Sequence, residues 1–204
     1  MKARVAVLVS GGGTNLQAIL DAQKAGGITS GDVILVVSNV RSAYALTRAK
    51  NAGVEAIVCE RGRGESRFDF EGRLLSILQS RNIDVIVLAG FMVILSKEFV
   101  SLYPDRIINV HPSLIPSFCG KGYYGLKVHE AALEYGVKVT GATVHMVNEI
   151  PDAGRILYQK AVEVKEGDTA EILQKRVMVE AEWILLPRAV EDISRRVLNE
   201  KGEI

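Results

Sequence analysis

The sequence has little cysteine and little histidine. Cysteine side chains form the disulfide bonds of many small proteins, and both residue types are common metal ligands. Its 204 residues include two cysteines, Cys59 and Cys119, which lie far apart and form no Cys-x-x-Cys pair. Disulfide scaffolds and structural zinc sites need more cysteine at closer spacing, so both classes are excluded. The three histidines are widely separated, and no local ligand spacing favours a metal ion.

Excess charge and long apolar runs are absent as well. There are 25 lysines and arginines against 24 acidic residues, which does not resemble the basic surface of a nucleic-acid-binding protein. No 18-residue apolar stretch and no cleavage signal follow the first residues, so we expect neither secretion nor membrane insertion but a cytoplasmic protein. With 48% hydrophobic residues, residues 1–204 fit a single globular domain.

What the sequence does contain is a regular alternation of strand and helix patterns. Near-continuous apolar runs at residues 4–9, 33–37, 54–58 and 83–88 are typical of strands buried on both faces. Helical patterns lie between them, after the glycines at 11–13, at 43–52 and at 70–78. The alternation predicts a Rossmann-like α/β fold, a mostly parallel sheet with helices on both faces.

The second half adds to the same sheet. It has strand patterns at residues 107–110, 139–147 and 156–164, and helical patterns at 127–135, 169–186 and 188–198. Pro187 stands at the last junction, where we expect a kink or a helix start. Three pairs have the spacing of a capping box or a close variant and predict helix starts: Thr14 with Gln17, Ser66 with Asp69, and Asp168 with Glu171.

A glycine-rich turn follows the first strand, at residues 10–16. The N-terminus of a helix after such a turn favours a phosphate group, although a tight turn that needs glycine for its conformation alone is the alternative. A dinucleotide fingerprint would need glycine where Leu16 stands, so NAD is disfavoured. No G-x-x-x-x-G-K-[ST] motif occurs, which disfavours a P-loop ATPase.

A polar pair, Asn109 and His111, ends the short strand at 107–110 and precedes Pro112. Strand alternation points both side chains to one face. One histidine before a proline is more often structural than catalytic. His145, from a later strand, and Asp152, from the loop that follows it, add an imidazole and a carboxylate and favour a catalytic site.

Four segments together resemble the phosphoribosylglycinamide formyltransferase family, over nearly the whole chain and in the family's order. They are the glycine loop, Leu88-Ala89-Gly90-Phe91-Met92, Asn109-Val110-His111-Pro112-Ser113-Leu114, and residues 141–154. The resemblance implies transfer of a formyl group from 10-formyltetrahydrofolate to glycinamide ribonucleotide in purine biosynthesis. The partners implied are therefore these two small molecules, with 10-formyltetrahydrofolate as the co-substrate. The resemblance implies no metal ion, and the protein would be a monomer or a homodimer.

The resemblance also implies roles for individual residues. Asn109 and His111 would hydrogen-bond the formyl oxygen, and Asp152 would pair with His111, keep it charged and relay a proton, with His145 in support. Gly13, Thr14 and Asn15 would bind the ribonucleotide phosphate and Glu182 its ribose, although the spacing from Arg176 to Glu182 is one residue longer than the family pattern. For the folate, the implied residues are Arg67, Met92, Val93, Ile94, Leu95, Asn109, Asn148, Glu149, Ile150, Pro151 and Asp152.

Some positions depart from the family pattern. Residues 117–125 are longer than the usual proline-glycine exit, with Cys119 where proline is common; Met146 replaces an aromatic residue and Ala153 a glycine. These differences affect the rims of the two substrate sites rather than Asn109, His111 and Asp152.

Other functions remain open at this stage. Relatives on the same core hydrolyse formyltetrahydrofolate or formylate methionyl-tRNA, usually with an added domain. His111, His145 and Asp152 could form a metal-dependent hydrolase site. Cys119 with His111 could form a thiol nucleophile, and a non-catalytic nucleotide-binding module would bind phosphate without formyl transfer.

Overall fold

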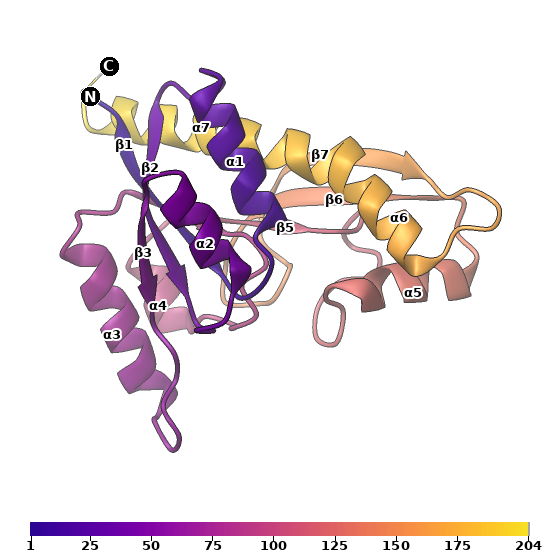
Figure 1. Cartoon of the computed structure of the whole chain (residues 1–204), viewed down its shortest axis with the longest axis horizontal. Helices are drawn as coiled ribbons and strands as arrows, with labels where there is room; N and C mark the ends of the chain where they lie inside the picture. The colour runs from indigo at the N-terminus through magenta and orange to yellow at the C-terminus, as the bar shows by residue number, and fades with distance from the viewer. Residues whose placement is uncertain (204) are drawn as a thin grey trace.

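The structure is a computed structural model that describes residues 1–203. Within those residues, seven strands form one sheet in the order β3-β2-β1-β4-β5-β6-β7 (Figure 1). Five strands are parallel: β1 (Ala3–Val9), β2 (Gly31–Ser38), β3 (Glu55–Val58), β4 (Val85–Leu88) and β5 (Ile107–His111). Two antiparallel strands, β6 (Val139–Met146) and β7 (Ile156–Glu163), extend the sheet beyond β5. The predicted fold class is confirmed.

Helices cover both faces of the parallel part of the sheet. Val5 and Val7 of β1 pack in one core with α1 (Thr14–Lys24), α2 (Tyr44–Asn51) and α7 (Trp183–Glu200). The intervening Ala6 and Leu8 pack in a second core with α3 (Arg67–Gln79) and α4 (Lys97–Ser101). This alternation explains the continuous apolar runs, because each residue of a central strand faces one of two helical layers.

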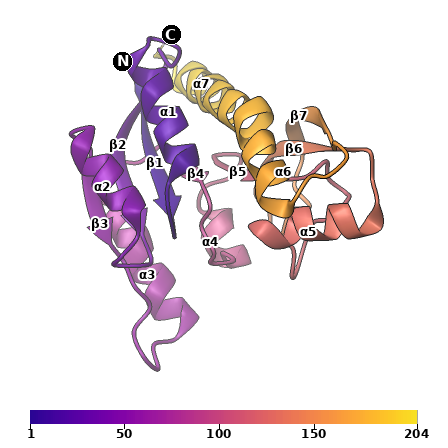
Figure 2. The ribbon, with the colours of Figure 1, turned by 45° about the vertical axis from the view of Figure 1, so that its right-hand side comes forward.

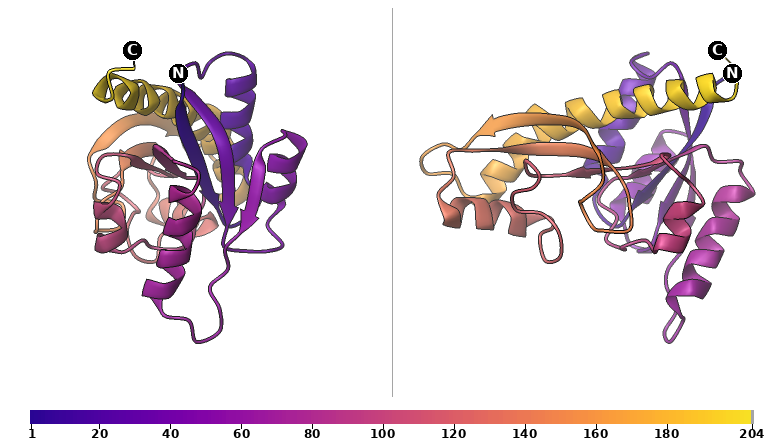
Figure 3. Two further views of the ribbon diagram at one scale, coloured as in Figure 1. Left: turned by 90° about the vertical axis from the view of Figure 1, so that its left-hand side faces the viewer. Right: turned by 180° about the vertical axis from the view of Figure 1, so that it is seen from behind.

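The antiparallel end of the sheet has its own small core. It joins β6 and β7 to α6 (Ala170–Val177), with α5 (Leu126–Tyr135) alongside α6. Helix α7 continues from this end back across the sheet to the corner where β1 begins (Figures 2 and 3). None of the helices in the described residues is both long and apolar enough to cross a membrane.

Helix starts agree with only one of the three predicted capping pairs. The Ser66 side chain accepts a hydrogen bond from the Asp69 N–H and caps α3, as predicted. Thr14 is the first residue of α1, and the cap position belongs to Gly13, which has no side chain to offer. Thr169, not Asp168, caps α6. Asp168 instead pairs with Arg176.

The break between the last two helices lies before Pro187, not at it. Residues Met178–Glu182 form a π-helical segment, with the Trp183 N–H bonded to the Met178 carbonyl, and α7 then runs through Pro187. A proline ring clashes with the carbonyl four residues earlier, here that of Trp183, the first residue after the π-helical turn. The expected helix start at Pro187 is therefore wrong, because α7 begins at Trp183, directly after the π-helical segment. The kink at Pro187 stays a prediction.

The strand order reverses beside β1, since β2 lies on one side of it and β4 on the other. In open α/β sheets, ligands bind at the carboxyl ends of the strands at such a point. The two strand exits are tied together there: Ser10 N–H donates to the Gly90 carbonyl at 3.1 Å, and Met92 N–H donates to Ser10 Oγ at 2.8 Å. The sheet thus brings the glycine turn, the β4 exit and the β5 exit to one edge.

Candidate active site

The end of β5 presents two polar side chains on one face of the sheet. Asn109 and His111 are two residues apart, so the pleat points both the same way. Strand β6 runs antiparallel to β5 and sets His145 opposite Asn109, with the Asn109 Nδ2 3.1 Å from the His145 Nε2. His145 Nδ1 lies 2.8 Å from the Met146 carbonyl, which can only accept, so His145 carries a proton on Nδ1.

Asp152 joins these side chains from the loop between β6 and β7. Its Oδ2 lies 3.5 Å from His111 Nδ1, and its Oδ1 lies 3.5 Å from both His145 Nε2 and Asn109 Nδ2. The residue adopts a left-handed φ of 57°, which is uncommon outside glycine and is held by the surrounding contacts. The predicted catalytic residues are therefore brought together, with His145 as their fourth member.

The segment that follows β5 makes further hydrogen bonds to His111 and Asp152. The Phe118 carbonyl accepts a hydrogen bond from His111 Nε2 at 2.8 Å, and the Gly120 N–H donates to Asp152 Oδ2 at 2.9 Å. Because Nε2 must carry a proton to donate, the neutral His111 ring has a bare Nδ1 facing Asp152. That nitrogen and the carboxylate can share one incoming proton.

Burial controls the protonation of the histidine. His111 is 4% exposed, and burial lowers its pKa despite the opposing effects of the Asp152 charge and the Phe118 carbonyl. The expectation that Asp152 keeps His111 charged is wrong in its net direction, because loss of hydration outweighs the ion pair. Burial alone would raise the pKa of Asp152, but hydrogen bonding to His145, the His111 imidazole and the Gly120 N–H together hold that pKa below its ordinary value.

A cleft of about 680 Å³ opens over this cluster. It is lined by Asn15, Gly90, Phe91, Met92, Val93, Ile94, Asn109, Val110, His111, Pro112, Gly120, Lys121, Gly122, Tyr123, Tyr124, Gly125, Pro151, Asp152, Gln174, Met178 and Glu182. The cleft has two ends, one near α1 and the π-helical turn and one toward the β6–β7 loop. Asn109, His111 and Asp152 line the cleft between them.

At the first end, Asn15 of α1 contacts Glu182 of the π-helical turn. The Asn15 Nδ2 donates to Glu182 Oε2 at 2.6 Å, and Glu182 is 5% exposed. Burial raises the pKa of Glu182 to about 7, and the Asn15 hydrogen bond only partly offsets this. A π-helical turn accommodates one extra residue, which accounts for the longer spacing between Arg176 and Glu182 and still lets Glu182 line the cleft.

The rest of the glycine turn supports Asn15 rather than lining the cleft. Gly13 has a φ of 72°, and a Cβ there would meet the Ala45 Cβ at 2.6 Å, so both conformation and space require glycine. The Thr14 hydroxyl donates to Met178 Sδ at 3.5 Å. Of the three predicted phosphate residues, only Asn15 reaches the cleft wall through its side chain, and Gly13 and Thr14 lie just outside it.

At the second end, a narrow pocket of about 100 Å³ continues the cleft inward. Its lining is mostly apolar: Leu88, Phe91, Val93, Ile94, Leu95, Asn109, His145, Val147, Asn148, Ile150, Pro151 and Asp152. Such a pocket suits a flat ring with a few polar edges. Most of the predicted folate residues line it, whereas Met92 lines only the wider cleft.

Two predicted folate residues lie outside both cavities. Arg67, at the start of α3, pairs with Glu71 at 3.0 Å and donates to the Ile94 carbonyl at 2.7 Å, so it braces the pocket wall. Glu149 lies 4.0 Å from Lys97. Sequence reasoning missed Leu88, Phe91 and Val147 in the pocket, and Gln174 and Met178 in the cleft. The apolar strand patterns around the pocket residues and the helical pattern around Gln174 and Met178 gave no sign that these side chains line a cavity. Residues 120–125 belong to the segment expected at the rims, and they line the cleft.

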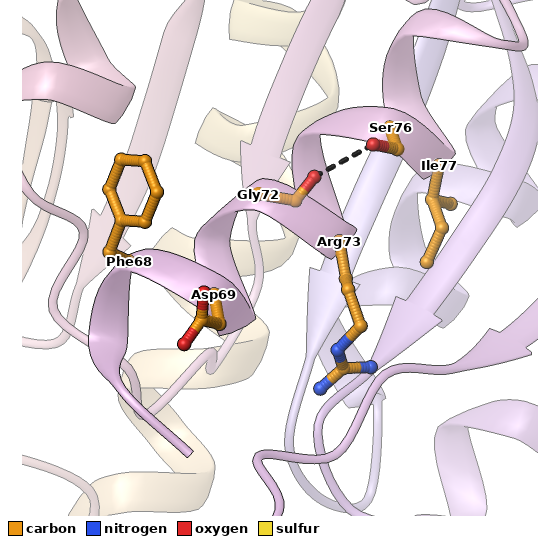
Figure 4. A pocket seen from close by; sticks show the side chains of 6 residues that line it. All are labelled: Phe68, Asp69, Gly72, Arg73, Ser76 and Ile77. Carbon is orange, nitrogen blue, oxygen red and sulfur yellow. Dashed lines mark hydrogen bonds between the residues drawn. The ribbon is translucent and has the colours of Figure 1, made fainter.

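A separate groove of about 570 Å³ runs along α3 (Figure 4). It is lined by Phe68, Asp69, Gly72, Arg73, Ser76 and Ile77, and the Ser76 hydroxyl donates to the Gly72 carbonyl at 2.9 Å. All six residues belong to one helix, and none lines the cleft. The groove therefore lacks the polar groups converging from several elements that distinguish the cleft.

The two rival chemistries find little support in the geometry. Across residues 1–203, no group of three or more His, Cys, Asp and Glu side chains is arranged to hold a metal ion. Cys119 donates its thiol to the Pro116 carbonyl at 3.3 Å. Burial, aided by the Asp152 charge, raises the pKa of Cys119, which disfavours the thiolate that a nucleophile requires.

Comparison with known proteins gives the family. The profile of the formyl transferase family matches residues 3–190. The chain belongs to the formyl transferase family. It is 42% identical over 205 residues to the human trifunctional purine biosynthetic protein adenosine-3, covering 100% of this chain and 20% of that protein. It is 40% identical over 178 residues to the chloroplastic phosphoribosylglycinamide formyltransferase of Arabidopsis thaliana, covering 87% of this chain and 61% of that one.

Solved structures of this family are similar in fold as well as sequence. The glycinamide ribonucleotide transformylase 1 of Symbiobacterium toebii is 42% identical, with a TM-score of 0.87, over 95% of this chain and 88% of that one. The Brucella melitensis phosphoribosylglycinamide formyltransferase is 39% identical, with a TM-score of 0.85, over 95% and 96% of the two chains. The predicted family is confirmed. This formyl transferase spans about a fifth of the human trifunctional relative.

Proposed function

We propose that this formyl transferase moves the formyl group of 10-formyltetrahydrofolate to the amine of glycinamide ribonucleotide, in purine biosynthesis. The observation that carries the proposal is the overlap of two unlike cavities, which share Asn109 and Asp152, with His111 lining the wider one. The narrow apolar pocket suits the pterin ring, and the wider end with Asn15 and Glu182 suits a sugar phosphate. Relatives named for this reaction share about 40% of the sequence.

The reaction requires a neutral amine, an oxyanion site and a route for one proton. The amine nitrogen attacks the formyl carbon, a C–N bond forms, and the carbonyl oxygen becomes an oxyanion. The Asn109 amide, and His111 when its Nδ1 carries a proton, are donors that line the cleft, and they stabilise that charge. The His111 Nε2 stays bonded to the Phe118 carbonyl. The bond from the formyl carbon to N10 of the folate then breaks, and N10 takes up a proton.

Asp152 receives the proton that the amine releases. Its carboxylate lies 3.5 Å from the bare His111 Nδ1, so the pair can hold this proton and return it to the leaving N10. The depressed pKa of Asp152 keeps the carboxylate ionised at neutral pH, and the lowered pKa of His111 keeps the ring neutral, with Nδ1 bare. His145, fixed by Met146, orients Asn109 and Asp152.

The roles of the remaining residues follow from their positions. Asn15 and Glu182 bind the sugar phosphate with the glycine turn at Gly13 and Thr14, whose first helical N–H groups lack partners within the helix. Val93, Ile94, Leu95, Asn148, Ile150 and Pro151 hold the folate ring. The proposal treats residues 1–204 as one formyltransferase domain acting in the cytoplasm as a monomer or homodimer.

The direct test follows both products. The protein is incubated with 10-formyltetrahydrofolate, with and without glycinamide ribonucleotide, and tetrahydrofolate and the formylated ribonucleotide are measured. We expect equal amounts of both, formed only when the ribonucleotide is present. Tetrahydrofolate release that is independent of the ribonucleotide would indicate the hydrolase and overturn the proposal. Ribonucleotide binding with no turnover would indicate a binding module instead.

A further inference from the structure

Lys121 supplies a positive charge to a cleft wall that otherwise carries carboxylates. Among the described residues that line the 680 Å³ cleft, it is the only lysine or arginine, while Asp152 and Glu182 are acidic. Its side chain is exposed. The residue lies in the 117–125 segment, which departs from the family pattern, so the family pattern assigns no role to it.

The segment that carries Lys121 is anchored on both sides. Gly120, the preceding residue, donates its N–H to Asp152, and the Phe118 carbonyl accepts from His111. The Phe118 ring also packs edge-on against Tyr123, with centroids 6.2 Å apart, and against Tyr135 of α5 at 6.1 Å. These contacts hold the backbone around Lys121 beside the catalytic cluster, and its exposed side chain lines the cleft.

The nearest cation to the glycine turn is already engaged. Arg48 donates from Nε to the Gly12 carbonyl at 2.8 Å and from Nη1 to Gln17 Oε1 at 3.0 Å. It therefore holds the turn in shape. A sugar phosphate carries close to two negative charges at neutral pH, and Asp152 and the ionised fraction of Glu182 add to the repulsion it meets. Of the lysines and arginines in residues 1–203, Lys121 alone lines the cleft wall and can offset that charge there.

We propose that Lys121 is a binding residue for the phosphate group of the sugar-phosphate substrate, in the cleft that Asn15 also lines. A lysine binds phosphate as a mobile point charge, which suits a side chain projecting from a glycine-flanked loop. Gly120 and Gly122 have φ values of 85° and 98°, which a residue with a Cβ rarely adopts, so the loop conformation depends on both glycines. This inference rests on the proposed function for the identity of the substrate.

The test measures the affinity for a phosphate monoester separately from catalysis. Binding of ribose 5-phosphate is measured by calorimetry for the wild type, Lys121→Ala, Lys121→Arg and Lys138→Ala. Lys138 is also exposed but lies outside the cleft, so it controls for loss of one surface charge. We expect Lys121→Ala to weaken binding about tenfold, because hydrogen bonds to charged groups have about that effect. Lys121→Arg should restore most of the affinity, and Lys138→Ala should match the wild type.

Steady-state kinetics distinguish the phosphate from the folate carboxylates, the other anions that enter the cleft. The KM for glycinamide ribonucleotide should rise about tenfold in Lys121→Ala, with kcat and the KM for the formyl-folate within twofold of the wild type. A rise confined to the folate KM, or unchanged ribose 5-phosphate binding, would overturn the inference. Failure of the wild type to formylate the ribonucleotide would refute the proposed function, while the calorimetric result would still decide the role of Lys121.

Discussion

The two ends of the cleft are built in different ways. The end proposed for the folate, here called the folate end, is a small pocket formed where β4, β5 and β6 meet. Strand pairing fixes its shape, because Leu88 stands beside Asn109, and Asn109 opposite His145. The end proposed for the ribonucleotide, the ribonucleotide end, is wider and is made of α1, a π-helical turn and the 120–125 loop. Paired strands give a cavity wall a fixed geometry. Helix ends and loops can change the charge and the size of a cavity without disturbing the sheet. Asp152 links the two ends.

The largest loss of activity should come from substitution of Asp152, which links the two ends of the cleft. Asp152→Asn removes the charge that faces His111 and His145 but keeps the size of the side chain. We expect kcat to fall about 10²–10⁴-fold, with both KM values little changed, because proton transfer depends on this group. Rapid-quench measurement of formyl transfer checks this. Glu166→Gln, at an exposed acid outside the cleft, is the matched control. A variant that kept near-normal kcat would remove Asp152 from the proton path.

Glu182 tests the ribonucleotide end through pH. Its pKa of about 7 in the folded protein lies above the ordinary 4.5, so the folded state binds more protons than the unfolded state between those values. The stability that this group contributes is therefore complete below pH 4.5 and is lost as the pH rises through about 7, by about 3 kcal/mol.

Glu182→Gln should remove this pH dependence. Denaturant unfolding of both proteins at pH 5 and pH 8 gives the comparison, and the difference in unfolding free energy between the two pH values should be smaller in the variant. The KM for the ribonucleotide should rise in the same variant, since we propose that the Glu182 carboxylate binds the sugar. Parallel pH profiles for the two proteins would contradict the burial of an ionisable Glu182.

Val147→Phe tests the folate end. Val147 lines the 100 Å³ pocket but not the wider cleft, so a larger side chain should fill space that the ring requires. We expect the KM for the formyl-folate to rise about tenfold, the effect of modest overpacking, with the ribonucleotide KM unchanged. Steady-state kinetics with each substrate varied in turn measure both. Equal changes in both KM values would show that the two ends are not independent.

The sequence predicted the folate end better than the ribonucleotide end, for physical reasons. Strand alternation is enough to place Asn109 and His111 on one face. Their contact with His145 depends on the register of the antiparallel strands β5 and β6. Their contact with Asp152 depends on the left-handed backbone conformation of that residue. A local sequence pattern encodes neither feature. The lowered pKa of His111 likewise depends on burial that only the packed structure creates.

The errors concentrate at helix ends. Pro187 predicted a helix start, but α7 begins at Trp183 and runs through Pro187. Thr14 and Asp168 had capping spacing but lie one residue away from the true caps. Glu149 and Arg67 line neither cavity and pair with Lys97 and Glu71, and their contact with the folate stays a prediction. The fold class needed only the period of the apolar residues, which packing does not alter.

The central claim is that one cleft joins a formyl donor to a sugar-phosphate amine. The most direct measurement is a single-turnover experiment with formyl-labelled 10-formyltetrahydrofolate, excess enzyme and glycinamide ribonucleotide. The account predicts that all of the label released from the folate appears on the ribonucleotide amine, and that Asp152→Asn slows this transfer without diverting the label. Label appearing as free formate, in amounts that do not depend on the ribonucleotide, would contradict it.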